Sequence, residues 1–229
     1  WRDRIRLAVG LSGDVVEVDG RLTLPFEDGE GQRLVLVDVG GAGSSAPWAR
    51  SPVPEQHQIR GLGPILLTVS ELSRTAFVLT EVMNMRRMRD YAAHGAHIHV
   101  FAMGEGGPAA ELHVLEDKAS PPARQGAGGV HHVAFRTPDE AQYHGWTQRL
   151  TELRVPNSGE IDRFYFRSLY FREPNGILFE IATDGPGFAT DEPMAALGEK
   201  LALPPFLEPR RAAIEAGVKP VGEGEQPWG

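Results

Sequence analysis

A histidine and a glutamate stand in two apolar runs where their side chains can act together. His132 opens the run VAF, which predicts a half-buried strand, and Glu180 lies inside ILFEIAT, where alternation puts every second side chain on one face. Burying an unpaired carboxylate costs on the order of several kcal/mol, so such a group is normally protonated, ion-paired or bound to a metal. Imidazole and carboxylate together are familiar ligands of Fe(II), Mn and Zn. The pair therefore indicates a metal site.

A structural interpretation of the same residues stays open. In it, His132 is a hydrogen-bonded histidine at the end of a strand, and Glu180 pairs with Arg163 or Arg167. Ion-pair networks of this kind occur in many proteins without any catalytic role, so the spacing alone does not choose between the two interpretations.

The turn before Glu180 predicts which residue faces it. The sequence Glu173–Ile177 (EPNGI) favours a type I turn with a left-handed glycine, which gives a three-residue loop with a bulge. In that register Tyr170 lies opposite Glu180, where a phenol can exchange a proton with an oxygen bound at the site. A two-residue loop would pair other residues. Arg163 is suited to orient an anionic oxygen or to stack on an aromatic ring, although taken singly Arg163 and Tyr170 are ordinary strand residues.

Two longer segments around these residues resemble a known superfamily. HHVAFRTPDEAQ resembles the first strand and helix start, and YFRSLYFREPNGILFEIATDGPGF the third and fourth strands, of a module of the vicinal oxygen chelate superfamily. This superfamily includes glyoxalases, bleomycin resistance proteins and extradiol dioxygenases, and the resemblance is to its ring-cleaving dioxygenases of the hydroquinone type. It implies an α+β fold in which repeated βαβββ modules pair into curved mixed sheets around a metal cavity.

The resemblance also implies roles for five residues. His132 and Glu180 match two protein ligands of the metal, which would be Fe(II), with Mn(II) or another divalent ion as alternatives. His131, Tyr170 and Arg163 match positions around the substrate, where the first two would handle protons and the arginine would hold a substrate oxygen. The implied reaction is O2-dependent cleavage of a dihydroxylated aromatic ring of the hydroquinone or catechol type. Because strand neighbours face opposite ways, His131 reaches the site only if the start of the strand is bent.

An internal repeat separates this module from an earlier copy. ILLTVSELSRTAFVLTEV begins at Ile65 and VAFRTPDEAQYHGWTQRL at Val133, an offset of 133 − 65 = 68 residues. His132 then corresponds to Pro64, whose side chain binds no metal, so the earlier copy is predicted to be scaffold. Its further strands are predicted at residues 96–103 and 111–116, joined by a glycine-rich hairpin, and the basic stretch 85–89 is predicted to be a solvated turn or strand start.

Four regions are expected along the chain. They are residues 1–45, the C-terminal half of an incomplete module; 59–117, the scaffold module; 129–184, the metal-bearing module; and 185–229, a helical extension and tail. The first region is predicted to contain a helix at 1–11 and strands at 15–18, 21–25 and 32–39. The last is predicted to contain helices at 191–200 and 209–216. Asp191 is predicted to cap the first of those helices. By the family's pattern a further module lies upstream and supplies the remaining histidine ligand. We therefore expect this chain to lack one ligand unless another polypeptide or a local histidine replaces it.

Local histidines are concentrated in the scaffold module. HGAHIHVF contains His94, His97 and His99, and the last two share a strand face, a spacing that can bind transition metals. A solvated or hydrogen-bonded strand is the more frequent arrangement. His113 and His144 are predicted to be surface or space-filling residues.

Composition limits the classes of function. A formal charge of −8 argues against a nucleic-acid partner, and no apolar run is long enough to cross a bilayer. The absence of cysteine excludes disulfides and thiolate chemistry. We expect a cytoplasmic protein whose partners are a small aromatic substrate and O2. Exposed sheet edges favour association, so a homo-oligomer is also expected.

Two other functions remain open at this stage. One is a glyoxalase-like metal-dependent lyase, isomerase or thiol transferase, whose activity would persist with Zn or Ni under anaerobic conditions. The other is a non-catalytic protein that binds a small aromatic without consuming oxygen.

Overall fold

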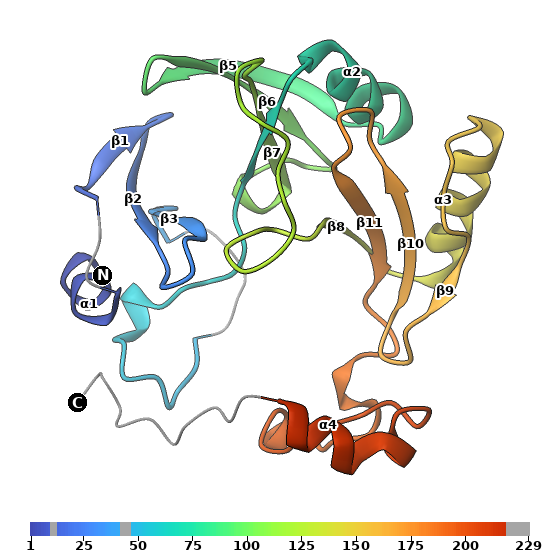
Figure 1. The fold of residues 1–229 in the computed structure, drawn as a ribbon. Coiled ribbons are helices and arrows are strands. Elements are labelled where there is room, and N and C mark those ends of the chain that lie inside the picture. The colour runs from blue at the N-terminus through green and yellow to red at the C-terminus, as the bar shows by residue number, and fades with distance from the viewer. Residues whose placement is uncertain (10–12, 42–46, 219–229) are drawn as a thin grey trace. The chain divides into compact units, whose positions relative to one another are not determined.

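A computed structural model describes residues 1–9, 13–41 and 47–218, which fall into two compact units. The first unit runs to His131 and the second begins at His132. Both combine helices with open, curved sheets, so the α+β class is confirmed (Figure 1). None of the described helices is long and apolar enough to cross a membrane.

The first unit starts with a helix and a three-stranded antiparallel sheet. Its elements are α1 (Arg2–Val9), β1 (Val16–Val18), β2 (Arg21–Glu27) and β3 (Arg33–Val37), with β2 in the centre. The helix and all three strands were predicted, although the last two residues of the predicted helix lie outside the described part of the chain. A 3-10 turn, η1 (Glu55–His57), follows in the predicted linker.

The second sheet of this unit is mixed. Its elements are β4 (Ile65–Val69), α2 (Leu72–Phe77), the π-helical turn η2 (Val78–Val82), β5 (Arg86–Ala93), β6 (Ala96–Ala102), the 3-10 turn η3 (Pro108–Ala110) and β7 (Glu111–Glu116). The strand order is β4-β7-β6-β5, with β4 parallel to β7 and the other pairs antiparallel. The predicted hairpin between β6 and β7 is confirmed. The basic stretch 85–89 proved to be the start of β5, a full strand whose mostly polar outer face gave no apolar alternation to detect.

Buried charges join the two sheets of the first unit. Arg89 of β5 donates to both oxygens of Glu111, at 2.8 and 2.9 Å, and its Nε donates to an oxygen of Asp19, at 3.1 Å, on the β1–β2 turn. The guanidinium holds the pKa of Glu111 down to about 2. His113 lies between Glu111 and the Tyr91 hydroxyl, and burial lowers its pKa. This network is the polar link between the β1–β2 hairpin and the second sheet.

The second unit repeats the topology of that mixed sheet. Its elements are β8 (Val133–Thr137), α3 (Glu140–Glu152), β9 (Ile161–Asp162), β10 (Arg167–Arg172) and β11 (Leu178–Thr183), in the order β8-β11-β10-β9. The strand β8 is parallel to β11, as β4 is to β7. Because β4 begins at Ile65 and β8 at Val133, the predicted offset of 68 residues is confirmed.

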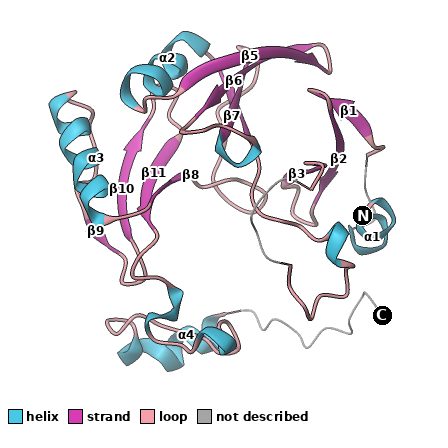
Figure 2. Ribbon diagram, turned by 180° about the vertical axis from the view of Figure 1, so that it is seen from behind, coloured by secondary structure: helices cyan, strands magenta, loops and turns pink. Residues whose placement is uncertain are grey.

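The helix α3 covers one face of the second unit's sheet (Figure 2). Asp139 caps it by accepting a hydrogen bond from the Gln142 backbone N–H at 2.8 Å. Tyr143 of the helix is fully buried, and Phe135 and Phe179 of the strands pack edge to face with ring centroids 5.0 Å apart. Each such buried apolar side chain contributes about 1.5–3 kcal/mol. This face is the core, so the alternate residues of β8, β10 and β11 occupy the opposite face.

The β10–β11 hairpin has the predicted turn. The Gly176 N–H donates to the Glu173 carbonyl at 2.8 Å, and the Glu173 N–H donates to the Ile177 carbonyl at 3.0 Å. Gly176 has a φ of +90°, the left-handed conformation for which glycine was predicted. The register pairs Tyr170 with Glu180, as predicted from the turn type.

The C-terminal region departs from prediction in one element. It contains the 3-10 turns η4 (Phe188–Thr190), η5 (Met194–Ala196) and η6 (Glu208–Arg210) and the helix α4 (Arg211–Gly217). The predicted helix from Asp191 to Lys200 is wrong, because Gly198 adopts a φ of +77° and interrupts it, and the Asp191 carboxylate accepts from the Tyr165 hydroxyl at 2.9 Å. The final predicted helix is confirmed as α4. Residues 219–229 lie outside the described part.

Candidate metal centre

A buried carboxylate lies at the centre of the open face of the second unit's sheet. Glu180 is only 3% exposed, yet both of its oxygens have partners. Oε1 accepts a short hydrogen bond from the Ser168 hydroxyl on β10, and Oε2 lies 2.7 Å from Nε2 of His132. Two such partners offset much of the cost of removing the carboxylate from water.

One part of the structural interpretation holds, because His132 is hydrogen-bonded at the end of its strand, to Glu180. The two arginines have other partners. Arg167 donates to Glu140 at 2.7 Å, and Arg163 donates to the Tyr170 hydroxyl at 3.3 Å. The predicted alternative, in which Glu180 pairs with one of these arginines, is therefore wrong. The group on Oε2 is the imidazole of His132, a side-chain type that can bind a metal.

Parallel pairing of β8 with β11 brings the histidine to the glutamate. Val133 pairs with Phe179 and Ala134 with Glu180, so His132, which precedes the strand, lies at the same edge as the carboxylate. The His132 side chain is 33% exposed, against 4% for the Glu180 side chain. The imidazole therefore stands between the buried carboxylate and the solvent.

Tyr170 and Arg163 form the rim of this cluster. The rings of Tyr170 and His132 meet edge to face, with centroids 6.1 Å apart and planes at 86°. The Arg163 guanidinium lies 5.5 Å from the centre of the Tyr170 ring as well as donating to its hydroxyl. Because the phenol oxygen accepts from Arg163, its own proton is directed elsewhere and is available to another acceptor.

Strained backbone holds the arginine in place. Phe164, the next residue, has a φ of +72°, which is a costly conformation of about 1–3 kcal/mol for a bulky side chain. Its N–H donates to the Asp162 carboxylate at 2.7 Å, and its ring packs against Tyr165 with centroids 4.9 Å apart. These contacts fix the turn between β9 and β10 on which Arg163 lies.

Comparison with known proteins places the chain in a superfamily. Residues 61–181, which span both mixed sheets, match the Glyoxalase/Bleomycin resistance protein/Dioxygenase superfamily. The chain belongs to this superfamily. The resemblance seen in the sequence is thereby confirmed.

Several relatives within the superfamily match most of the chain. MhqA of Bacillus subtilis, provisionally named a ring-cleaving dioxygenase, is 45% identical over 96% of this chain and 71% of its own length. A chlorohydroquinone/hydroquinone 1,2-dioxygenase of Sphingobium indicum is 29% identical over 91% of this chain and 64% of its own. The crystal structure of a provisionally assigned Bacillus subtilis dioxygenase superposes with a TM-score of 0.79 at 32% identity, over 90% of this chain and 64% of that one. This chain thus spans about two thirds of the length of these relatives.

The His132–Glu180 pair supplies an imidazole nitrogen and a carboxylate oxygen, which are donor atoms that suit a divalent metal ion. Two ligands bound at right angles to one ion, each at about 2.1 Å, lie about 3 Å apart, close to the 2.7 Å observed between Nε2 and Oε2. A facial triad also needs a third ligand. Within the described residues no further histidine or carboxylate joins this pair. The pair fits two positions of such a centre.

His131 differs from the other four predicted residues. Its side chain is exposed, and it directly precedes His132 at the end of the first unit. Its predicted contact with substrate stays a prediction.

Ser168 is the member of the cluster that sequence reasoning missed. It lies on β10 opposite Ala182, two residues from Tyr170 and therefore on the same face as the carboxylate. Continuing the predicted hairpin register by one further pair on the same face would have found it.

Proposed function

We propose that this chain is part of an Fe(II)-dependent dioxygenase that uses O2 to cleave a dihydroxylated aromatic ring of the hydroquinone or catechol type. The observation that carries the proposal is the buried Glu180 carboxylate, bonded to His132, with a phenol and a guanidinium on the same rim. Membership of the superfamily and the names of the relatives support it.

His132 and Glu180 would hold the metal. When bound, Fe(II) in a two-histidine, one-carboxylate site supplies a redox-active Lewis acid with positions open to a diol and to O2. Ser168 donates to Oε1 of Glu180, so Oε2 would be the oxygen free to bind the metal. The third ligand would come from outside residues 132–218, whose other histidine, His144, is exposed and paired with Glu160 at 2.6 Å.

Tyr170 and Arg163 would act on the substrate. A diol must lose protons before it is a good electron donor, and a positioned phenol can accept or return a proton at a ring oxygen. The guanidinium offers donors in a planar fork and carries a permanent positive charge, so it would hold an anionic ring oxygen beside the phenol. His131 is proposed as a second proton carrier.

Removal of the phenol hydroxyl tests its proton-transfer role. We expect Tyr170→Phe to lower kcat about 100-fold, because general acid–base catalysis is lost while the ring and its packing against His132 remain. KM for the aromatic should change little, since Arg163 is still present. Steady-state oxygen uptake as a function of substrate concentration measures both constants. Tyr165→Phe, which removes a hydroxyl bound to Asp191, is the matched control, and an unaltered kcat in Tyr170→Phe would refute the assignment.

The serine on the carboxylate makes a separate prediction. We expect Ser168→Ala to weaken Fe(II) binding by about 10- to 100-fold, because Oε1 of Glu180 loses its hydrogen-bond donor. Anaerobic titration with a competing chromophoric chelator measures the affinity. Ser73→Ala, which removes an exposed hydroxyl from the other unit, should bind iron as the parent does. Equal affinities in the two variants would contradict a role of Ser168 in holding the ligand.

The test of the whole proposal is oxygen uptake. Protein loaded anaerobically with Fe(II) is given a panel of hydroquinones and catechols, with His132→Ala in parallel. Uptake that requires His132, with formation of a ring-opened acid, is the expected result. Activity that persists with Zn or Ni in the absence of O2 would instead indicate a lyase, isomerase or transferase. Stoichiometric binding of the aromatic by metal-free protein with no uptake would indicate a binding protein.

A further inference from the structure

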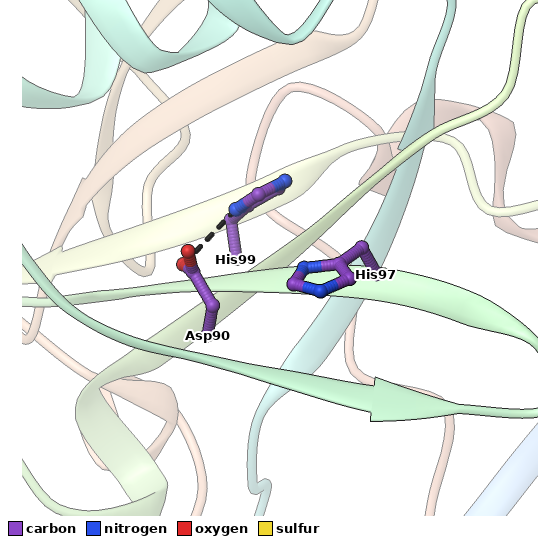
Figure 3. A group of neighbouring side chains, drawn as sticks. All are labelled: Asp90, His97 and His99. Carbon is purple, nitrogen blue, oxygen red and sulfur yellow. Dashed lines mark hydrogen bonds and ion pairs between the residues drawn. The ribbon is translucent and has the colours of Figure 1, made fainter.

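Three potential ligands lie together on the outer face of the β5–β6 hairpin in the first unit. Asp90 of β5 pairs directly with His99 of β6, and His97 is two residues from His99 on the same face. Figure 3 shows the three side chains on one side of the strands, with the His97 ring beside the Asp90–His99 pair. The ligand atoms of all three residues lie within 4.8 Å of one another.

A cation already occupies part of this cluster. The Arg87 guanidinium donates to Oδ2 of Asp90 and to Nδ1 of His99, at 2.8 Å in each case. Nδ1 of His99 also lies 3.0 Å from Oδ1 of Asp90. In the tautomer with a proton on Nδ1 the imidazole donates to this carboxylate, and in the other tautomer Nδ1 accepts from Arg87. In the second tautomer Nδ1 and the carboxylate both face the guanidinium with lone pairs, and a metal ion can take the place of this cation.

The histidines also border an open hollow. Its volume is about 540 Å³, and its lining includes His97, His99, Leu72, Leu115 and Glu116. Glu116 accepts from the Leu72 N–H at 2.8 Å, which fixes a further carboxylate at this hollow. A metal bound by the three ligands would therefore have space for water or another ligand on its open side.

A second group of potential ligands in the same unit behaves differently. The ligand atoms of these residues, Asp19, Glu111 and His113, also lie within 4.8 Å of one another. Arg89 donates to both carboxylates, and its side chain is 34% exposed. A metal there would have to displace a guanidinium bonded to both carboxylates. Arg87 is 49% exposed and its pair with Asp90 is screened by solvent, so it can leave.

We propose that Asp90, His97 and His99 bind a divalent transition metal of the Zn²⁺ class, at a site separate from His132 and Glu180. Two imidazoles and one carboxylate suit borderline ions such as Zn²⁺, Ni²⁺ and Cu²⁺ better than Mg²⁺ or Ca²⁺, which prefer oxygen ligands. The ion replaces the Arg87 contact and cross-links β5 to β6. Since it binds the folded hairpin, it stabilises the first unit in proportion to the logarithm of its concentration over Kd. The inference does not depend on the dioxygenase proposal.

Zinc titration of an untagged His132→Ala protein tests the site, because the other metal pair is disabled in that background. We expect one Zn²⁺ to bind, and His97→Ala and His99→Ala each to weaken binding at least about tenfold. Asp90→Asn, which keeps the size of the side chain, should do the same. His144→Ala, which removes an exposed histidine from the second unit, is the control and should leave Kd unchanged.

Arg87→Ala provides a test that keeps all three ligands. Because it removes the competing cation, we expect it to bind Zn²⁺ more tightly than the parent. Circular dichroism verifies that each variant is folded, and thermal unfolding with and without Zn²⁺ should show a metal-dependent shift that His99→Ala lacks. The reference for all these variants is the His132→Ala protein. The proposal is overturned if that protein binds no Zn²⁺, if both histidine variants bind with its Kd, or if Arg87→Ala binds more weakly.

Discussion

Protein in which His132 or Glu180 is replaced by alanine should retain no iron. Each variant removes one of the two proposed ligands. Loss of a residue that only supports a ligand already lowers metal affinity by about 10- to 100-fold. Loss of a ligand itself should exceed that range and abolish oxygen uptake. Iron content after anaerobic loading and gel filtration, measured by inductively coupled plasma spectrometry, provides the direct comparison.

The contacts of the two residues indicate how to separate metal loss from misfolding. Glu180→Gln keeps the volume of the side chain and an oxygen that can accept from Ser168, but it removes the charge that the metal requires. His144→Ala removes an exposed histidine and should retain full iron. Iron occupancy equal to the parent in both His132→Ala and Glu180→Gln would remove these residues from the metal centre and the dioxygenase proposal with them.

Local sequence rules were sufficient for the part of the site carried by one hairpin. The left-handed position of Gly176 fixed the loop length, the loop length fixed the register, and the register placed Tyr170 opposite Glu180. The repeat offset similarly located β8 from β4. In each case the interaction is between residues whose relation is set by a short turn or by a duplicated segment.

Long-range contacts were not predictable in the same way. The Asp90–His99 pair is local, since a two-residue turn joins β5 to β6, but β5 has no apolar alternation that would have marked it as a strand. Arg89 reaches Asp19, which is 70 residues away, across two sheets. Side chains that meet through tertiary packing leave no fixed spacing in the sequence, so charge and periodicity carry no information about which of them will pair.

Loss of Arg89 should destabilise the first unit by about 1–3 kcal/mol, because the buried Glu111 carboxylate loses its two hydrogen bonds from the guanidinium. Glu111, whose side chain is 6% exposed, would keep only His113 and the distant Arg21, at 4.0 Å. Hydrogen exchange of the β5–β7 amides in Arg89→Ala, with EDTA present, measures the loss within this unit. Arg87→Ala, two residues earlier on the same strand but exposed, should change stability by no more than about 0.5 kcal/mol.

The same network should make the first unit sensitive to acid in a defined direction. The folded-state pKa of Glu111 is lowered from 4.5 to about 2 by its hydrogen bonds from Arg89, so its contribution is present above pH 4.5 and is lost as the pH falls towards 2. Burial lowers the pKa of His113 below 6.5, so protonation of this histidine also favours the unfolded state as the pH falls. Glu111→Gln should remove the loss of stability between pH 4.5 and pH 2, whereas the unmutated protein should keep it. If protection of the β7 amides falls equally with pH in Glu111→Gln and the unmutated protein, titration of Glu111 is not the source of this acid sensitivity.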